Sequence, residues 1–276
     1  MVDSDEARRV YWREQMEQAA RFMETIAGWP VAECGEPLAS LPQAAAAAGV
    51  EVVFSERPHV LGLPRLYYLR SGLIAGFVAV AREMNQRGWV LRVEDGFRTL
   101  AMQQHQARGP HTFDVVLAKL RWECGGDPSP ELLARRLGAL VAASPKVGTH
   151  MSGSAIDIAV LDRTSGDEID RGGPYVDLSE RTPMNSPFVS AAARANRQAI
   201  TAVFARHGFV TYPWEFWHYS AGDAYAECLG GTGRPARYGA VHAELPSGAV
   251  TPIEAPEQPL NTLEDIARQL RERVGA

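Results

Sequence analysis

The sequence predicts an α+β protein with a small antiparallel sheet packed with helices. Long stretches repeat apolar residues every three or four positions, which is typical of helices. Shorter stretches are rich in Ile, Val and aromatic residues, which is typical of strands. The two kinds of stretch follow one another without regular alternation, which favours α+β over a regular α/β sheet. The chain has 276 residues, of which 46% are hydrophobic and 22% charged, an ordinary globular balance.

The first expected element is a helix over residues 6–27, which Gly28-Trp29-Pro30 ends. A short strand is expected at 51–54, and 67–69 is interpreted as a loop or an edge strand. The pattern then predicts a helix at 71–88, a strand at 89–94, two or three helices within 100–143, a strand at 154–161, a helix at 190–207, and short strands at 209–212 and 216–220.

The remaining segments lack this order. Residues 163–185 are rich in Gly, Pro and Asp without a period, which predicts a long loop of the kind that is functional or mobile. Asn261 is expected to cap a charged amphipathic helix. The organisation expected from these patterns is a helical extension at 1–60, a catalytic domain at 60–228, a linker at 229–260 and a C-terminal helix at 261–276.

Composition excludes several classes of protein. The net charge of -5 argues against binding to nucleic acid or to an anionic membrane. Three cysteines without a CxxC pair support neither a disulfide scaffold nor a cysteine zinc site. The first residues lack a basic region followed by an apolar one, and no apolar stretch is long enough to span a bilayer. We therefore expect a cytoplasmic protein and leave its oligomeric state open.

Two segments carry residues that could do chemistry, 148–158 and 214–219. Asp157 lies in an apolar, strand-like run, where a buried carboxylate needs a partner such as a metal ion or an arginine. Glu215 and His218 lie among four aromatic residues. Taken singly, each segment also fits a structural role, with a salt-bridged aspartate or an aromatic strand whose polar residues lie at the edge.

Together the two segments contain the donor set of a catalytic metal. His150, Asp157 and His218 make a three-ligand set, and catalytic zinc typically has three protein ligands and a water. Glu215 is then placed to act as general base. A regular strand would point Glu215 and His218 to opposite faces, so a bulge or a turn must re-aim one of them.

The combined pattern resembles the signature of the zinc D-alanyl-D-alanine metallopeptidases, and most closely the dipeptidases of the vancomycin-resistance type. The resemblance is carried by His150-x-x-Gly153-x-Ala155-x-Asp157, by Trp214-Glu215-x-Trp217-His218-Tyr219 and by Glu94-Asp95-Gly96-Phe97-Arg98. It covers about residues 60–225. Two positions depart from the family pattern: Thr99 stands where proline is usual, and Gly148 where serine is common.

The resemblance implies a role for each matching residue. His150, Asp157 and His218 would bind Zn²⁺, Glu215 would be the catalytic base, and Arg98 would stabilise the tetrahedral oxyanion. Asp95 and Trp217 are candidates for substrate binding. The implied activity is hydrolysis of a dipeptide or another small peptide similar to D-alanyl-D-alanine.

Two alternatives stay open from the residues. Two histidines and one carboxylate also make the facial triad of Fe²⁺ enzymes that use oxygen, although such sites usually have His-x-Asp spacing. An oxygen-using biosynthetic enzyme on a recruited dipeptidase scaffold is therefore one alternative. The other is a module without catalysis that keeps zinc for structure.

Overall fold

A central sheet organises the computed structural model, which describes residues 4–59 and 62–274. Its five strands lie in the order β2 (Val52–Phe54), β4 (Trp89–Asp95), β5 (Ala155–Asp162), β7 (His218–Ser220) and β6 (Val210–Thr211). All neighbours pair antiparallel except β2 and β4, which are parallel. The predicted α+β class is confirmed. The expectation of an antiparallel sheet is corrected at one edge, where a crossover through α3 (Ile74–Gln86) brings β4 parallel to β2.

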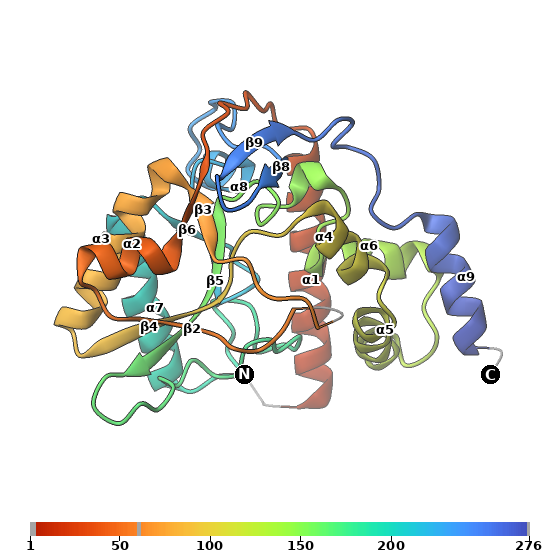
Figure 1. Ribbon diagram of the computed structural model, residues 1–276. Helices are drawn as coiled ribbons and strands as arrows, with labels where there is room; N and C mark the ends of the chain where they lie inside the picture. The colour runs from red at the N-terminus through yellow and green to blue at the C-terminus, as the bar shows by residue number, and fades with distance from the viewer. Residues whose placement is uncertain (1–3, 60–61, 275–276) are drawn as a thin grey trace.

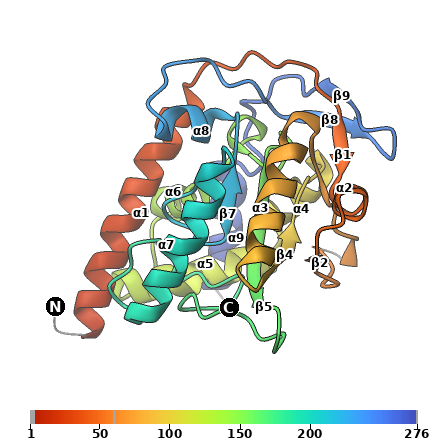
Figure 2. The ribbon, with the colours of Figure 1, turned by 90° about the vertical axis from the view of Figure 1, so that its left-hand side faces the viewer.

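One face of the sheet packs against two helices, α3 and α7 (Ala191–Arg206), which lie in front of it in Figure 2. Side chains alternate along β5, and its isoleucines and Val160 point into this layer. The fully buried residues of the layer include Phe77, Val80, Leu91, Ile156, Ile158, Val160, Ile200 and Phe204. Asp157 alternates with the isoleucines, so its side chain points to the other face of the sheet.

Helices also lie beyond that other face (Figures 1 and 2). They are α1 (Asp5–Ala27), α4 (Leu100–Arg108), α5 (Pro110–Cys124), α6 (Pro130–Leu140) and α9 (Leu263–Val274). The helix predicted at 6–27 is thus confirmed as α1, and its apolar stripe is buried. The cap of α9 is Thr262 and not Asn261, because the Thr262 hydroxyl accepts from the Asp265 amide at 3.1 Å.

Smaller elements join the outer segments to this body. The N-terminal segment supplies β2 to the central sheet. It also contains β1 (Leu38–Ser40), which pairs with β3 (Tyr68–Arg70), and α2 (Leu41–Ala48), which follows β1. Residues 229–260 were expected to be a linker. They instead contain the hairpin of β8 (Val241–Glu244) and β9 (Ala249–Pro252), after α8 (Ala224–Leu229).

The expected domain boundaries stay predictions, and the ends of the two outer segments, 1–3 and 275–276, lie outside the described residues. Within the described part of the chain, none of the helices has both the length and the apolar character needed to span a membrane.

Candidate active site

Three polar residues lie in register across the middle of the sheet. Asp95 of β4 pairs with Asp157 of β5, and Asp157 pairs with His218 of β7. A register shift between Val93 and Asp95 breaks the alternation of β4. Without it Asp95 would point into the same apolar layer as Val93, and the bulge re-aims it to the face that Asp157 occupies. Sheet register therefore places three acidic or imidazole side chains side by side.

The turn before β5 brings in His150. Gly153 ends this turn at φ 67, and a Cβ there would lie 2.4 Å from Leu38 Cδ2. Only glycine combines that backbone conformation with so close a neighbour, which explains its place in the sequence motif. The amide of Gly153 donates to the carbonyl of His150 at 3.2 Å. The short turn folds His150 back over Asp157.

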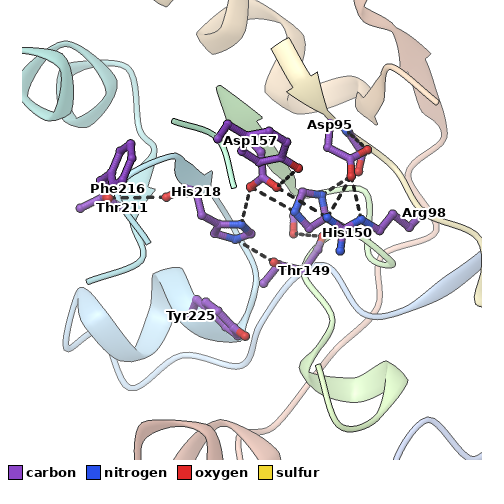
Figure 3. Close-up of polar contacts among 12 residues, drawn as sticks. Asp95, Arg98, Thr149, His150, Asp157, Thr211, Phe216, His218 and Tyr225 are labelled. Carbon is purple, nitrogen blue, oxygen red and sulfur yellow. Dashed lines mark hydrogen bonds and ion pairs between the residues drawn. The ribbon is translucent and has the colours of Figure 1, made fainter. Parts of the chain in front are cut away.

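His150, Asp157 and His218 form a compact, buried cluster (Figure 3). Each offers a ligand atom, and these atoms lie within 4.8 Å of one another. Asp157 Oδ1 is 2.9 Å from His218 Nδ1 and 3.3 Å from His150 Nε2. The far nitrogens are also held: His150 Nδ1 lies 2.7 Å from the Gly96 carbonyl, and His218 Nε2 lies 2.9 Å from the Thr149 hydroxyl. Such outer contacts fix the ring orientation of metal-binding histidines.

The electrostatics of the cluster suit a cation. Burial and the nearby Arg98 lower the pKa of His150, which favours the neutral ring. A carbonyl can only accept, so Nδ1 of His150 carries the proton and the lone pair of Nε2 faces the Asp157 carboxylate. Burial alone would raise the pKa of Asp157, but the two histidines hold it well below its usual range. Nε2 and the Asp157 oxygen are then two acceptors 3.3 Å apart, an arrangement that a bound cation would stabilise.

Glu215 reaches the same cavity through a turn and not along a strand. Its amide donates to the Tyr212 carbonyl at 3.2 Å, and its carbonyl accepts from the His218 amide at 3.1 Å. β7 begins only at His218, so the expected strand over 216–220 is shorter than predicted. The turn resolves the problem of opposite faces. Burial raises the pKa of Glu215 to about 7, which suits a group that takes and returns protons near neutral pH.

Arg98 is buried beside the cluster and is held by a shared carboxylate. Its Nε and one terminal nitrogen each lie 2.9 Å from Asp95 Oδ2, and its other terminal nitrogen donates to Gln103 at 3.2 Å. Arg65 lies 2.8 Å from the same Asp95 oxygen. Burial alone would raise the pKa of Asp95, but Arg98, His150 and Arg65 lower it. Asp95 therefore orients two arginines, and its carboxylate is not free for a ligand.

All seven candidate residues line one cavity of about 500 Å³. They are Asp95, Arg98, His150, Asp157, Glu215, Trp217 and His218. Trp217 is 2% exposed, and its ring packs edge-on against Tyr175 at 5.7 Å between centroids. The structure brings together every residue that the sequence singled out. Their roles stay proposals.

The cavity also contains residues that the sequence analysis missed. Tyr175 lies in the loop predicted over 163–185 and donates its hydroxyl to Asp157 Oδ2 at 3.1 Å. The length of that loop was the one signal for it. His59 is 7% exposed and lines the cavity, and its Nδ1 has no partner among the described residues. Irregular sequence around it carried no signal.

The departures from the family pattern have local explanations. Thr99 caps α4, since its hydroxyl accepts from the Met102 amide at 3.2 Å, a bond that proline could not make. Gly148 ends a 3-10 turn over Pro145–Val147, and a Cβ there would lie 3.3 Å from the Met151 side chain. The cavity therefore lacks a hydroxyl at this position.

Comparison with known proteins supports the resemblance. Residues 130–235 match the family described as D-ala-D-ala dipeptidase. The chain is 26% identical over 221 residues to the D-alanyl-D-alanine dipeptidase of Synechocystis sp., covering 70% of this chain and 85% of that protein. Dipeptidases of the same name match over 75 residues: that of Escherichia coli at 33% identity, covering 27% of this chain and 38% of its own length, and that of Enterococcus faecalis at 27%, covering 27% and 37%.

The matched region contains five of the seven candidate residues, namely His150, Asp157, Glu215, Trp217 and His218. A structural module without catalysis is therefore not supported, and nothing in the comparisons favours iron. The geometry and the comparisons together confirm the resemblance to the zinc D-alanyl-D-alanine metallopeptidases, and the chain is a metallopeptidase.

Proposed function

We propose that this metallopeptidase uses zinc to hydrolyse a small peptide similar to D-alanyl-D-alanine. The observation that carries the proposal is the buried cluster of His150, Asp157 and His218 with Glu215 in the same cavity. The relatives' names supply the substrate class. The cytoplasmic location expected from the sequence stays a prediction.

The donor set fits zinc. Two neutral imidazole nitrogens and one carboxylate are its usual catalytic ligands, and the three residues that would hold it line the cavity. Neighbouring ligand atoms of a tetrahedral zinc ion lie about 3.4 Å apart when each bond is about 2.1 Å. The 3.3 Å between His150 Nε2 and Asp157 Oδ1 is close to that spacing. When bound, zinc supplies a Lewis acid for the scissile carbonyl and lowers the pKa of a water.

Other residues of the cavity transfer the proton, stabilise the developing charge and limit the access of water. Glu215, with its pKa near neutrality, takes the proton of the attacking water and returns it to the leaving amine. Arg98 presents a permanent positive charge to the oxygen that becomes negative during attack. Asp95 keeps the Arg98 guanidinium in place through two contacts at 2.9 Å. Trp217 and Tyr175 form an aromatic side of the cavity that limits access of bulk water.

The test is metal-dependent hydrolysis by the full chain. The protein is stripped with a chelator, and release of D-alanine from D-alanyl-D-alanine and from its N-acylated forms is measured before and after one equivalent of Zn²⁺ is added. We expect turnover only with zinc, at one bound ion per chain. Equal turnover by the stripped protein, or no turnover of any of these peptides by the loaded protein, would contradict the proposal.

A further inference from the structure

The cavity continues beyond the metal cluster along a wall that the proposed chemistry does not use. This apolar wall consists of Met23, Leu140, Val147, Tyr212 and Tyr225. The rings of Tyr212 and Tyr225 lie 6.0 and 6.1 Å from the His218 ring, so the wall starts beside a proposed metal ligand. In Figure 3, Tyr225 lies below His218, away from Arg98 and Asp95.

The two tyrosines present apolar surface to the cavity because their hydroxyls are already bound. Tyr212 donates to the Ala139 carbonyl at 3.2 Å. Tyr225 donates to the Val147 carbonyl at 3.1 Å and lies 3.2 Å from the Met23 sulfur. A polar substrate group placed here would lose water without gaining a partner. An apolar group would gain from the burial.

The cavity has no carboxylate to spare for the free ammonium of a dipeptide. Three carboxylates line it among the described residues, those of Asp95, Asp157 and Glu215. Asp95 is bound by Arg65 and Arg98, and the other two are assigned to the metal and the proton. Asp177 of the nearby loop does not line the cavity and is paired with Arg181 at 2.9 Å. A buried ammonium without a carboxylate would be strongly disfavoured.

The size of the cavity also favours a substrate larger than a dipeptide of two alanines. Its volume of about 500 Å³ lies within the roughly 300–1,000 Å³ of cavities that hold drug-sized ligands. A dipeptide of two alanines has only methyl side chains and would leave the apolar wall uncovered. The wall includes Met23 of α1, so the N-terminal helix takes part in shaping it.

We infer that the site takes a peptide whose amino end is acylated, and that a bulky apolar acyl group packs on the wall formed by Met23, Leu140, Val147, Tyr212 and Tyr225. The inference rests on the proposed function and narrows its substrate class. An amide in place of the ammonium removes the charge that the cavity cannot pair. The acyl group then covers the wall beside His218.

Three substrates test this inference on the zinc-loaded full chain: D-alanyl-D-alanine, its N-acetyl form and its N-phenylacetyl form. We expect kcat/KM to rise in that order, by at least tenfold from the free dipeptide to the phenylacetyl form. The same order is expected for affinity, measured by calorimetry with Glu215→Gln, which binds the peptides with strongly reduced turnover. A free dipeptide that is cleaved faster and bound more tightly than both acylated forms would overturn the inference while leaving the proposed function intact.

If no peptide is cleaved, binding measurements distinguish the proposed function from the inferred binding of the acyl group. If the wild-type protein cleaves none of the three peptides but Glu215→Gln binds them in the expected order, the proposed function is wrong and the inferred subsite is supported. If none binds, both are wrong. Leu140→Trp fills the wall and is expected to lower kcat/KM for the phenylacetyl form at least tenfold, and by more than it lowers kcat/KM for the acetyl form. The matched control is Leu229→Trp, since Leu229 is 38% exposed and lies outside the cavity; equal effects of both variants would also overturn the inference.

Discussion

The two sides of the cavity are built in different ways. The metal cluster depends on sheet register and one tight turn, which bring Asp157, His218 and His150 together from two short segments. The apolar wall is assembled from α1, the end of α6, and the segments around Val147, Tyr212 and Tyr225. Local sequence motifs specify the first side, and tertiary packing specifies the second. Chemistry and substrate choice can therefore be changed separately: Leu140→Trp changes the apolar wall, and the following variants change the side of the metal cluster.

The largest effect is expected from losing a metal ligand. His218→Ala removes one of three protein ligands, so bound zinc and hydrolysis should both fall below detection. His207→Ala is the matched control, because His207 pairs with Glu83 at the surface, at 2.9 Å, and lies outside the cavity. Metal content by mass spectrometry and turnover of the same sample check the result. Full zinc binding by His218→Ala would show that the cluster is not the metal site.

A smaller effect is expected from Arg98→Lys. The lysine keeps the charge beside Asp95 but loses the planar fork that donates in several directions. Loss of one oxyanion contact lowers kcat by about 10²–10³-fold, with zinc content unchanged. The control is Arg92→Lys, whose side chain pairs with Glu94 and Glu168 and does not line the cavity. Steady-state kinetics measure kcat, and an unchanged kcat would show that Arg98 does not stabilise the oxyanion.

Zinc affinity itself should respond to Thr149→Val. Its hydroxyl lies 2.9 Å from His218 Nε2 and fixes the ring. Loss of such an outer contact typically weakens metal binding about 10–100-fold. Competition with a fluorescent chelator measures the dissociation constant, and Thr164→Val in an exposed loop serves as control. Affinity equal to that of the wild type would mean that the contact does not orient the ligand.

The smallest effect concerns Tyr175→Phe, which removes the hydroxyl that donates to Asp157 at 3.1 Å. A hydrogen bond of this kind is worth about 0.5–1.5 kcal/mol, so kcat/KM should fall about threefold to tenfold. Tyr238→Phe, which loses a bond to Glu36 away from the cavity, should leave kcat/KM unchanged. A loss above 10²-fold for Tyr175→Phe would instead make this hydroxyl part of the chemistry.

The difference between local sequence motifs and tertiary packing also explains what could be predicted from the sequence. The helix at α1, the strand at β5 and all seven candidate site residues follow local periodicity or short motifs, and the structure places those seven in one cavity. The bulge that re-aims Asp95 could not be predicted, because it exists only in the pairing of β4 with β5. Neither could the turn that carries Glu215, which depends on a hydrogen bond to Tyr212.

The other features that could not be predicted depend on packing between distant parts of the chain. His59 enters the cavity from an irregular segment, and Met23 from the buried face of an N-terminal helix whose periodicity indicated only a core position. The hairpin of β8 and β9 was missed because Pro and Gly around it indicated a linker. Its first strand is held by a hydrogen bond from the Val241 amide to the Met151 carbonyl at 3.1 Å, a contact between residues far apart in the sequence.

The most direct test of the central claim is Glu215→Gln, studied for metal content and turnover in one preparation. The substitution keeps the size of the side chain and removes its ability to take a proton. We expect one zinc ion per chain, as in the wild type, with kcat lowered by about 10²–10⁴-fold. Hydrolysis at the wild-type rate with zinc fully bound would contradict it.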